Sequence, residues 1–446
     1  MAGDMINGNP SKSLLLFAVP MILGNIFQQM YNIVDSIVVG NFVGPDALAA
    51  VGISTSITFL FIAFATGISI GSAVFISQLF GAGKLGEMKT AISTVLISVL
   101  CLSSFLMIVG LTANKAILKF MNTPFNILED AQTYLQIYFS GIIFLFLYNA
   151  LTAVYNALGD STTPLIFLII SAFVNIMLDL IFVIRFSMGV SGVAWATLIA
   201  QGISATLSFL NLIYRIKKMN VKEESKLFDK HILLKVSKIA IPSTIQQSIV
   251  SIGMLLVQTL VNGYGSVVVA GYTAATKIDS IAIQPMVNVG SAVSTFTAQN
   301  IGAKKPDRIK AGHRAALVMV TTIGLTIAVL QFLFGEKFIG CFINVKENPE
   351  VVKVGVEYLR VVSVFYFVMG AMNVTNGVLR GAADMKIFLV TTLTNLTVRV
   401  VIAYGASYFI GERAIWWSIP AGWFAGLCVA YIRLQSGKWK EKSMIR

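Results

Sequence analysis

The stretch Gln78-Leu-Phe-Gly-Ala-Gly-Lys84 decides the fold, because it returns 221 residues later (residue 299 against residue 78) as Gln299-Asn-Ile-Gly-Ala-Lys-Lys305. Three further matches occur in the same chain order: Asn41-x-x-Gly44 with Asn262-x-x-Gly265, Gly71-Ser-Ala-Val74 with Gly290-Ser-Ala-Val293, and Tyr134-Leu135 with Tyr358-Leu359. Chance can supply one such match, but four in one order indicate an internal duplication. The chain is therefore predicted to consist of two related halves.

The composition indicates that both halves lie in a membrane. Of the 446 residues 56% are hydrophobic and 12% charged, and the mean hydropathy of +0.81 is far too high for a soluble domain. A helix needs about 20 apolar residues to cross a bilayer. Twelve runs meet this length: 13–41, 46–80, 88–112, 127–157, 162–184, 188–214, 235–262, 266–300, 307–334, 351–380, 384–410 and 414–436. The predicted fold class is an all-α polytopic membrane protein with twelve transmembrane helices.

The most polar internal segment divides the chain into two six-helix bundles. Residues 215–238 are predicted to be a cytoplasmic linker between an N-terminal bundle (1–214) and a C-terminal bundle (239–446). Each half has an even number of spans, so both halves start on the same side of the membrane and the repeats are parallel. Their pseudo-two-fold axis then lies along the membrane normal, an architecture typical of transporters with the substrate path between the halves.

The distribution of charge explains the formal net charge of +13 without nucleic acid. With the N-terminus inside, most of the 33 Lys and Arg residues fall on the inner side, as the positive-inside rule requires. We therefore expect an integral protein of a bacterial or archaeal plasma membrane, with both termini cytoplasmic. The three cysteines are scattered and odd in number, and His231 and His313 lie in charged segments, where solvated side chains are expected.

Two acids stand in apolar runs of the first half, where a carboxylate costs about 2.5–3.5 kcal/mol and marks a functional site by default. Helical spacing places polar side chains in stripes: Gln28, Tyr31, Asn32 and Asp35; Ser171, Asn175 and Asp179; Asn149, Thr152 and Asn156. Asp35, Asp179 and Thr197 lie at depths that agree within one turn, so these side chains can converge. Asp35, Asn175, Asp179 and Thr197 would then form an oxygen cage suited to Na⁺ or a proton. The alternative is that each acid only hydrogen-bonds a neighbouring helix.

The second half carries a different charge pattern. Arg399 occupies the repeat position of Asp179, and it lies at a depth similar to that of Lys277 and Asp279. This charge cluster is most simply a neutralising pair, with a structural and a functional role both open. Met369 and Met372 beside Asn373 suggest an adaptable cavity. The residues expected to line the substrate cavity are Gln28, Tyr31, Asn32, Asn149, Asn156, Met369 and Asn373. Pro20 shares a helix with Asp35 and is either a fixed bend or a hinge.

Together these features resemble the multidrug and toxic compound extrusion (MATE) transporters. The resemblance rests on the two six-span halves, the repeated Gln-x-x-Gly-Ala-x-Lys, and Leu158-Gly-Asp160 and Leu379-Arg-Gly381 after spans four and ten. It implies cation-coupled drug efflux through a first-half site at Asp35, Asn175, Asp179 and Thr197, with Pro20 at the bending position of span one. The NorM-like branch also has carboxylates on spans seven and ten. Those spans here show Gln246, Gln247, Met369 and Asn373, which makes the chain more similar to the DinF-like branch.

We therefore expect a secondary-active antiporter, not an enzyme, that exports amphipathic, mostly cationic organic compounds in exchange for H⁺ or Na⁺. No cofactor beyond the coupling ion is expected, and the partners would be drugs, organic cations and membrane lipids, with the protein a monomer. A lipid-linked precursor flippase of the same superfamily is the alternative, which would be expected to have a basic central cavity. An intramembrane aspartyl protease using Asp35 and Asp179 is disfavoured, because no Gly-x-Gly-Asp signature surrounds either residue.

Overall fold

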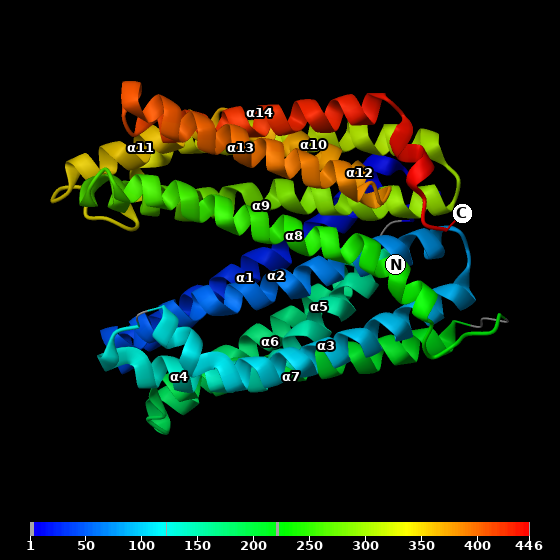
Figure 1. The fold of residues 1–446 in the computed structure, drawn as a ribbon, viewed down its shortest axis with the longest axis horizontal. Coiled ribbons are helices and arrows are strands. Elements are labelled where there is room, and N and C mark those ends of the chain that lie inside the picture. The colour runs from blue at the N-terminus through cyan, green and yellow to red at the C-terminus, as the bar shows by residue number, and fades with distance from the viewer. Residues whose placement is uncertain (1–3, 122, 220–222, 446) are drawn as a thin grey trace.

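The computed structural model describes residues 4–121, 123–219 and 223–445, and these residues form helices and turns without a strand (Figure 1). The helices of the first half are α1 (Pro10–Val38) with the π-helical turn η1 (Val39–Val43), α2 (Pro45–Gly81), α3 (Leu85–Phe120), α4 (Phe125–Ser140), α5 (Ile142–Ala157), α6 (Thr162–Leu180) with the π-helical turn η2 (Ile181–Arg185), and α7 (Gly189–Lys218). Those of the second half are α8 (Lys230–Asn262), α9 (Ser266–Gly302), α10 (Pro306–Gly340), α11 (Pro349–Ser363), α12 (Tyr366–Gly381), α13 (Met385–Ile410), α14 (Arg413–Gln435) and the short turn η3 (Lys438–Lys442).

These helices correspond one to one with the twelve predicted spans. Nine helices of the described chain are long and apolar enough to cross a membrane by themselves, and α4 with α5, bent by 49° at Gly141, makes a tenth. The other two predicted spans are α9 and the pair α11–α12. Helix α9 falls short on apolarity because it carries polar groups such as Asp279, which must face protein or water rather than lipid. Helices α11 and α12 have 15 and 16 residues, so each is too short to cross a membrane by itself.

The segment between the halves is shorter than the predicted 215–238. Helix α7 continues to Lys218 and α8 begins at Lys230, so the charged ends of both helices extend past their apolar runs. Asp229 starts α8 by accepting hydrogen bonds from the backbone N–H groups of His231 (2.8 Å) and Ile232 (3.2 Å). Residues 220–222 of the predicted linker lie outside the described residues.

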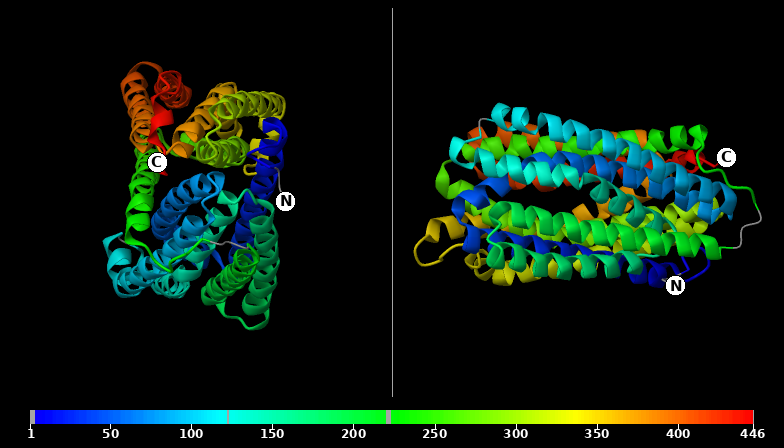
Figure 2. Two further views of the ribbon diagram at one scale, coloured as in Figure 1. Left: turned by 90° about the vertical axis from the view of Figure 1, so that its right-hand side faces the viewer. Right: turned by 90° about the horizontal axis from the view of Figure 1, so that it is seen from below.

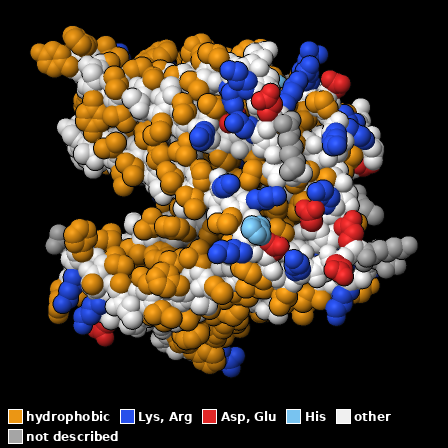
Figure 3. Space-filling view, turned by 45° about the vertical axis from the view of Figure 1, so that its right-hand side comes forward, with side chains coloured by type: hydrophobic (Ala, Val, Ile, Leu, Met, Phe, Trp, Pro, Cys, Tyr) orange, Lys and Arg blue, Asp and Glu red, His pale blue; other side chains and the backbone are white. Residues whose placement is uncertain are grey.

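The two halves meet closely at the end of the molecule that carries both termini and separate toward the other end (Figure 1). The space-filling view shows the resulting cleft between the halves (Figure 3). At the closed end α2 packs against α8 and α9, with Gly71 against Ala240, Gly81 against Gln299, and Gly302 against Gln78. The repeated Gln-x-x-Gly motif therefore meets its own copy across the pseudo-two-fold axis.

Hydrogen bonds from the same motif follow the same symmetry. Gln78 donates from Nε2 to the backbone oxygen of Gly381 (3.0 Å), and Gln299 donates to that of Ala157 (2.8 Å). Each glutamine thus ties its helix to the end of a helix in the opposite half. The repeated sequence stretch closes this end of the molecule.

Matching ion pairs occur beside these contacts. Asp160, between α5 and α6, pairs with Arg215 at the end of α7, and Asp384 pairs with Arg433 Nε of α14 at 2.7 Å. Burial tends to raise the pKa of Asp160, but hydrogen bonds from Thr163 and the Arg215 guanidinium outweigh it and hold this pKa below its ordinary value. Each pair ties the start of one helix to the end of another in the same half.

Helix α1 does not belong to the first half alone. Leu14, Phe17 and Ala18 are buried in the hydrophobic core of the second half, and Asn25 Nδ2 donates to Asn288 Oδ1 of α9 (2.9 Å). Beyond this point α1 packs against α6. Seen along the long axis, α1 and α8 bridge the two groups of helices on opposite sides (Figure 2). Pro20 lies inside α1 where its contacts pass from one half to the other.

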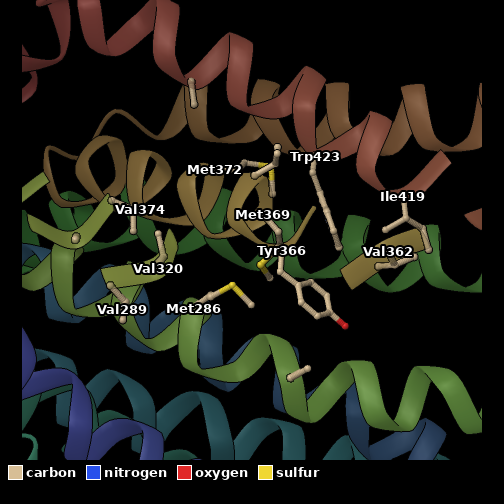
Figure 4. Packing of buried hydrophobic residues seen from close by; sticks show 14 of the residues in the cluster. Met286, Val289, Val320, Val362, Tyr366, Met369, Met372, Val374, Ile419 and Trp423 are labelled. Carbon is tan, nitrogen blue, oxygen red and sulfur yellow. The ribbon is translucent and has the colours of Figure 1, made fainter. Parts of the chain in front are cut away.

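The core of the second half is rich in methionine and aromatic side chains. Met286, Tyr366, Met369, Met372 and Trp423 pack together between α9, α12 and α14 (Figure 4). His313 was expected in a solvated segment, and this is wrong: it is buried on α10, with Nε2 3.2 Å from Thr375 Oγ1. Helix α10 begins at Pro306 and carries charged residues over its first two turns. These charges made the segment around His313 resemble a solvated loop, although the helix has already begun there.

Candidate functional site

The structure brings the four predicted ion-binding residues together on α1, α6 and α7. The carboxyl groups of Asp35 and Asp179 are close enough to influence each other electrostatically. One turn before Asp179, Asn175 Nδ2 donates to Thr197 Oγ1 at 3.5 Å. Asp179 is 0% and Asn175 3% exposed. The two acids are therefore neighbours across the contact between α1 and α6.

Several oxygen atoms of this group have no hydrogen-bond donor within the part of the chain that the structure describes. They are Oδ1 of Asp35, Oδ1 of Asn175 and both carboxyl oxygens of Asp179. Buried oxygens are normally paired, so an unpaired set suggests an absent ligand. Two neighbouring buried carboxyl groups are stable when they share a proton or when a cation lies between them. The donor set fits H⁺ or Na⁺, and ion binding here stays a prediction.

Local backbone geometry supports a special role for this region. Helix α1 changes to the π-helical turn η1 four residues after Asp35, and α6 changes to η2 two residues after Asp179. Single π-helical turns inside helices are rare and are frequent at functional sites. Both acids thus lie just before a local distortion of their helix.

Sequence reasoning missed Tyr134 of α4, which lies near both carboxyl groups. Its repeat counterpart Tyr358 donates to the Asp279 carboxylate from Oη at 3.3 Å. The signal was present in the repeat itself, because Tyr134-Leu135 and Tyr358-Leu359 are one of its four matches. In both halves the repeated tyrosine stands beside a buried acid.

The residues predicted to share one substrate cavity are divided among three. A first-half cavity of about 80 Å³ includes Gln28, Tyr31, Asn149, Asn175 and Thr197. A central cavity of about 280 Å³ between the halves includes Asn149, Asn156 and Gln247. A second-half cavity of about 220 Å³ includes Met369, Asn373 and Gln247. Asn32 is exposed on α1 and does not line these three. Asn149 lines both the first-half and the central cavity, and Gln247 lines both the central and the second-half cavity.

The charge cluster of the second half does not form the expected neutralising pair. Asp279 instead accepts hydrogen bonds from Tyr366 (2.5 Å) and Tyr358, and among the described residues no base approaches it within 4 Å. Lys277 is exposed, with its ammonium 5.7 Å from the centre of the Phe342 ring. Arg399 has an unpaired, buried Nε atom. Lys277 and Asp279 are two residues apart on one helix, so their side chains point to different sides. They therefore do not meet, although they lie at a similar depth along the helix.

Arg380 is a second residue that sequence reasoning missed. It lies on α12 and lines both the central and the second-half cavity. Its guanidinium donates from Nε to Ser294 Oγ and from Nη2 to Ser291 Oγ, both at 3.2 Å. The signal was its position in Leu379-Arg-Gly381, at the inner end of a span rather than in the following loop.

Comparison with known proteins agrees with this architecture. The MatE family matches residues 20–181 and 242–405, one match in each predicted half. The chain is 32% identical to the probable multidrug resistance protein YpnP of Bacillus subtilis, and the match covers 99% of each chain. It is 23% identical to the probable multidrug resistance protein NorM of Thermotoga maritima, and that match covers 97% of this chain and 94% of the relative.

Solved structures confirm the fold class. One is an outward-facing conformation of a multidrug resistance MATE family transporter of the MOP superfamily, with a TM-score of 0.90, 23% identity and 98% of both chains covered. A MOP superfamily transporter from Pyrococcus furiosus gives the same values. The twelve-helix fold with two repeats is therefore confirmed, while assignment to the DinF-like branch stays a prediction. Because the family matches both halves and a relative is similar along its whole length, the chain belongs to the MatE family, whose members are membrane transporters and not enzymes.

Proposed function

We propose that this protein is a secondary-active antiporter that exports amphipathic, mostly cationic organic compounds in exchange for H⁺ or Na⁺. The observation that carries the proposal is the Asp35–Asp179 pair, whose buried oxygens lack donors and so suit a proton or a cation. Its relatives named as multidrug resistance proteins support the export of drugs. The cleft between the halves supports a route for them.

The coupling ion and the drug need only favour opposite conformations. An ion entering from the open end neutralises the two acids, which weakens their attraction for a cationic drug and favours its release. The drug and the ion then act on one equilibrium through their different affinities for its two states. Helix α1 suits the transmission of this change, because it packs against the second half before Pro20 and against α6 near Asp35.

The same proposal includes the orientation and the assembly. Both termini would lie in the cytoplasm, so the cleft opens to the outside of a bacterial or archaeal plasma membrane. The protein would act as a monomer surrounded by lipid. The closed end carries many Lys and Arg side chains, as the positive-inside rule expects of a cytoplasmic face (Figure 3).

The lipid-linked precursor flippase remains a second candidate because of one observation. Arg380 provides positive charge at the central cavity, where a flippase would bind an anionic headgroup. The acids of the first half have no evident use in that function. A flippase would transport a lipid-linked pyrophosphate and leave cationic dyes in place.

The test is dye efflux from vesicles under an imposed proton gradient and then an imposed sodium gradient. Asp35→Asn and Asp179→Asn should each reduce gradient-driven efflux to background, because an amide has the same volume but holds neither the proton nor the charge. Asp46→Asn, which changes an exposed acid at the start of α2, should leave efflux unchanged. Near-normal coupled efflux in both site variants would refute the proposal.

A further inference from the structure

The central and second-half cavities share one charged residue, and it is a cation. Arg380, Gln247, Val287 and Ser291 line both cavities, and among the described residues that line either one there is no acid. The acids of the first half lie elsewhere, on α1 and α6. The path between the halves thus has a positive group in one half and a negative pair in the other.

Among the described residues, the guanidinium of Arg380 has no counterion within 4 Å. Its two hydrogen-bond acceptors are the neutral hydroxyl groups of Ser291 and Ser294, and its charge lies 6.0 Å from the centre of the Phe388 ring. The nearest acid along the chain, Asp384, is paired with Arg433. A guanidinium has five N–H donors, so donors remain available beside the cavities. A buried charge without a partner is costly, and an arriving anion would relieve that cost.

Other polar atoms around the cavities are also without partners. Thr152 Oγ1 and Asn156 Oδ1 beside the central cavity, and Asn376 Oδ1 beside the second-half cavity, are buried and make no hydrogen bond with any described residue. A threonine hydroxyl can donate to an anion. An asparagine can present either its oxygen or its amide group, because the two ends exchange by rotation about its last side-chain bond.

We propose that Arg380 binds the carboxylate of a zwitterionic amphiphile whose cationic group is attracted to the acids of the first half. The fork of a guanidinium matches a carboxylate in two parallel hydrogen bonds. Asn149 lines both the first-half and the central cavity, so one elongated molecule can reach from one region to the other. This inference rests on the proposed function and extends it from cations to zwitterions.

The test uses two probes that differ in one group: a rhodamine dye with a free carboxylate and the methyl ester of the same dye. Binding to the purified full chain is measured by fluorescence anisotropy, and efflux is measured in vesicles. The wild type should bind the acid at least about tenfold more tightly than the ester, since a charge-assisted hydrogen bond is lost in the ester. Arg380→Gln should reduce the acid-to-ester affinity ratio to about one, and Arg380→Lys should restore part of it.

Arg314→Gln is the matched control, because it removes an exposed arginine on α10 of the same half and should preserve the ratio. If Arg380 only joins α9 to α12, its loss would weaken the binding of both dyes equally. The acid-to-ester affinity ratio would then stay unchanged, and this result would overturn the inference. If the ester is exported under a gradient while Arg380→Gln leaves the acid-to-ester affinity ratio unchanged, this inference fails but the proposed antiport stands. An Arg380-dependent ratio without gradient-driven efflux of either dye would support the inference and overturn the proposed antiport.

Discussion

Gly81 lies where the two copies of the repeated motif touch, and Gly81→Ala is expected to open the end of the molecule that carries both termini. A Cβ atom added at Gly81 would lie 2.7 Å from the carbonyl carbon and 2.8 Å from the Cα of Gln299. These are backbone atoms of α9, so they cannot rotate away as a side chain could. Relief requires α2 and α9 to separate.

The contact distances give the size of the effect. Carbon atoms pack best at about 3.5–4.0 Å, so the added methyl group is too close by about 0.8 Å or more. Overpacking of this kind costs about 1–3 kcal/mol. Only the conformation closed at this end bears that cost. The equilibrium between conformations should therefore shift toward the open form by about 5- to 150-fold.

The shift is measurable with two spin labels in nanodiscs, at Glu87 on α3 and Lys310 on α10, both exposed near the closed end in opposite halves. Pulsed electron–electron double resonance should show a longer distance between the two spin labels in Gly81→Ala than in the parent protein. Gly52→Ala is the matched control on the same helix, because a Cβ there meets no heavy atom within 4 Å. Identical distance distributions for the two alanine variants would refute the reasoning.

Three further expectations concern buried acids. Asp384→Asn should lower the free energy of unfolding by about 3–5 kcal/mol, because Arg433 is left as an uncompensated buried charge; thermal melts of both single variants and the double variant should show non-additive losses. The pKa of Asp160 is lowered in the folded protein, so its stabilising contribution is complete above its unfolded pKa of about 3.9 and is lost as the pH falls through the folded value. The melting temperatures of wild type and Asp160→Asn should therefore begin to converge as the pH falls below about 4 and should meet only below the folded pKa, and a constant difference down to strongly acidic pH would contradict this. Tyr366→Phe removes the 2.5 Å hydrogen bond to Asp279 and should cost about 1–3 kcal/mol in the same melts, with no loss counting against the tyrosine-bonded acid.

Some parts of the site were within reach of sequence reasoning because they depend on spacing along one helix. Asn175 and Asp179 are four residues apart and must share a face of α6, and their depth matched that of Asp35 and Thr197. The same reasoning failed for Lys277 and Asp279, which are equally deep but lie on different sides of α9. Depth along a helix follows from residue number, whereas the direction of a side chain relative to other helices does not.

The sequence by itself determined the twelve spans, the duplication and the pair of acids, because apolar length, repetition and helical spacing are properties of consecutive residues. Only the tertiary structure decided that the Gln-x-x-Gly motifs meet across the axis, that tyrosines bond Asp279, and that Arg380 lies at the central cavity. Each of these depends on how the helices are rotated about their own axes and how deeply they overlap. That arrangement is set by packing between residues far apart in the chain, which a pattern within one helix does not specify.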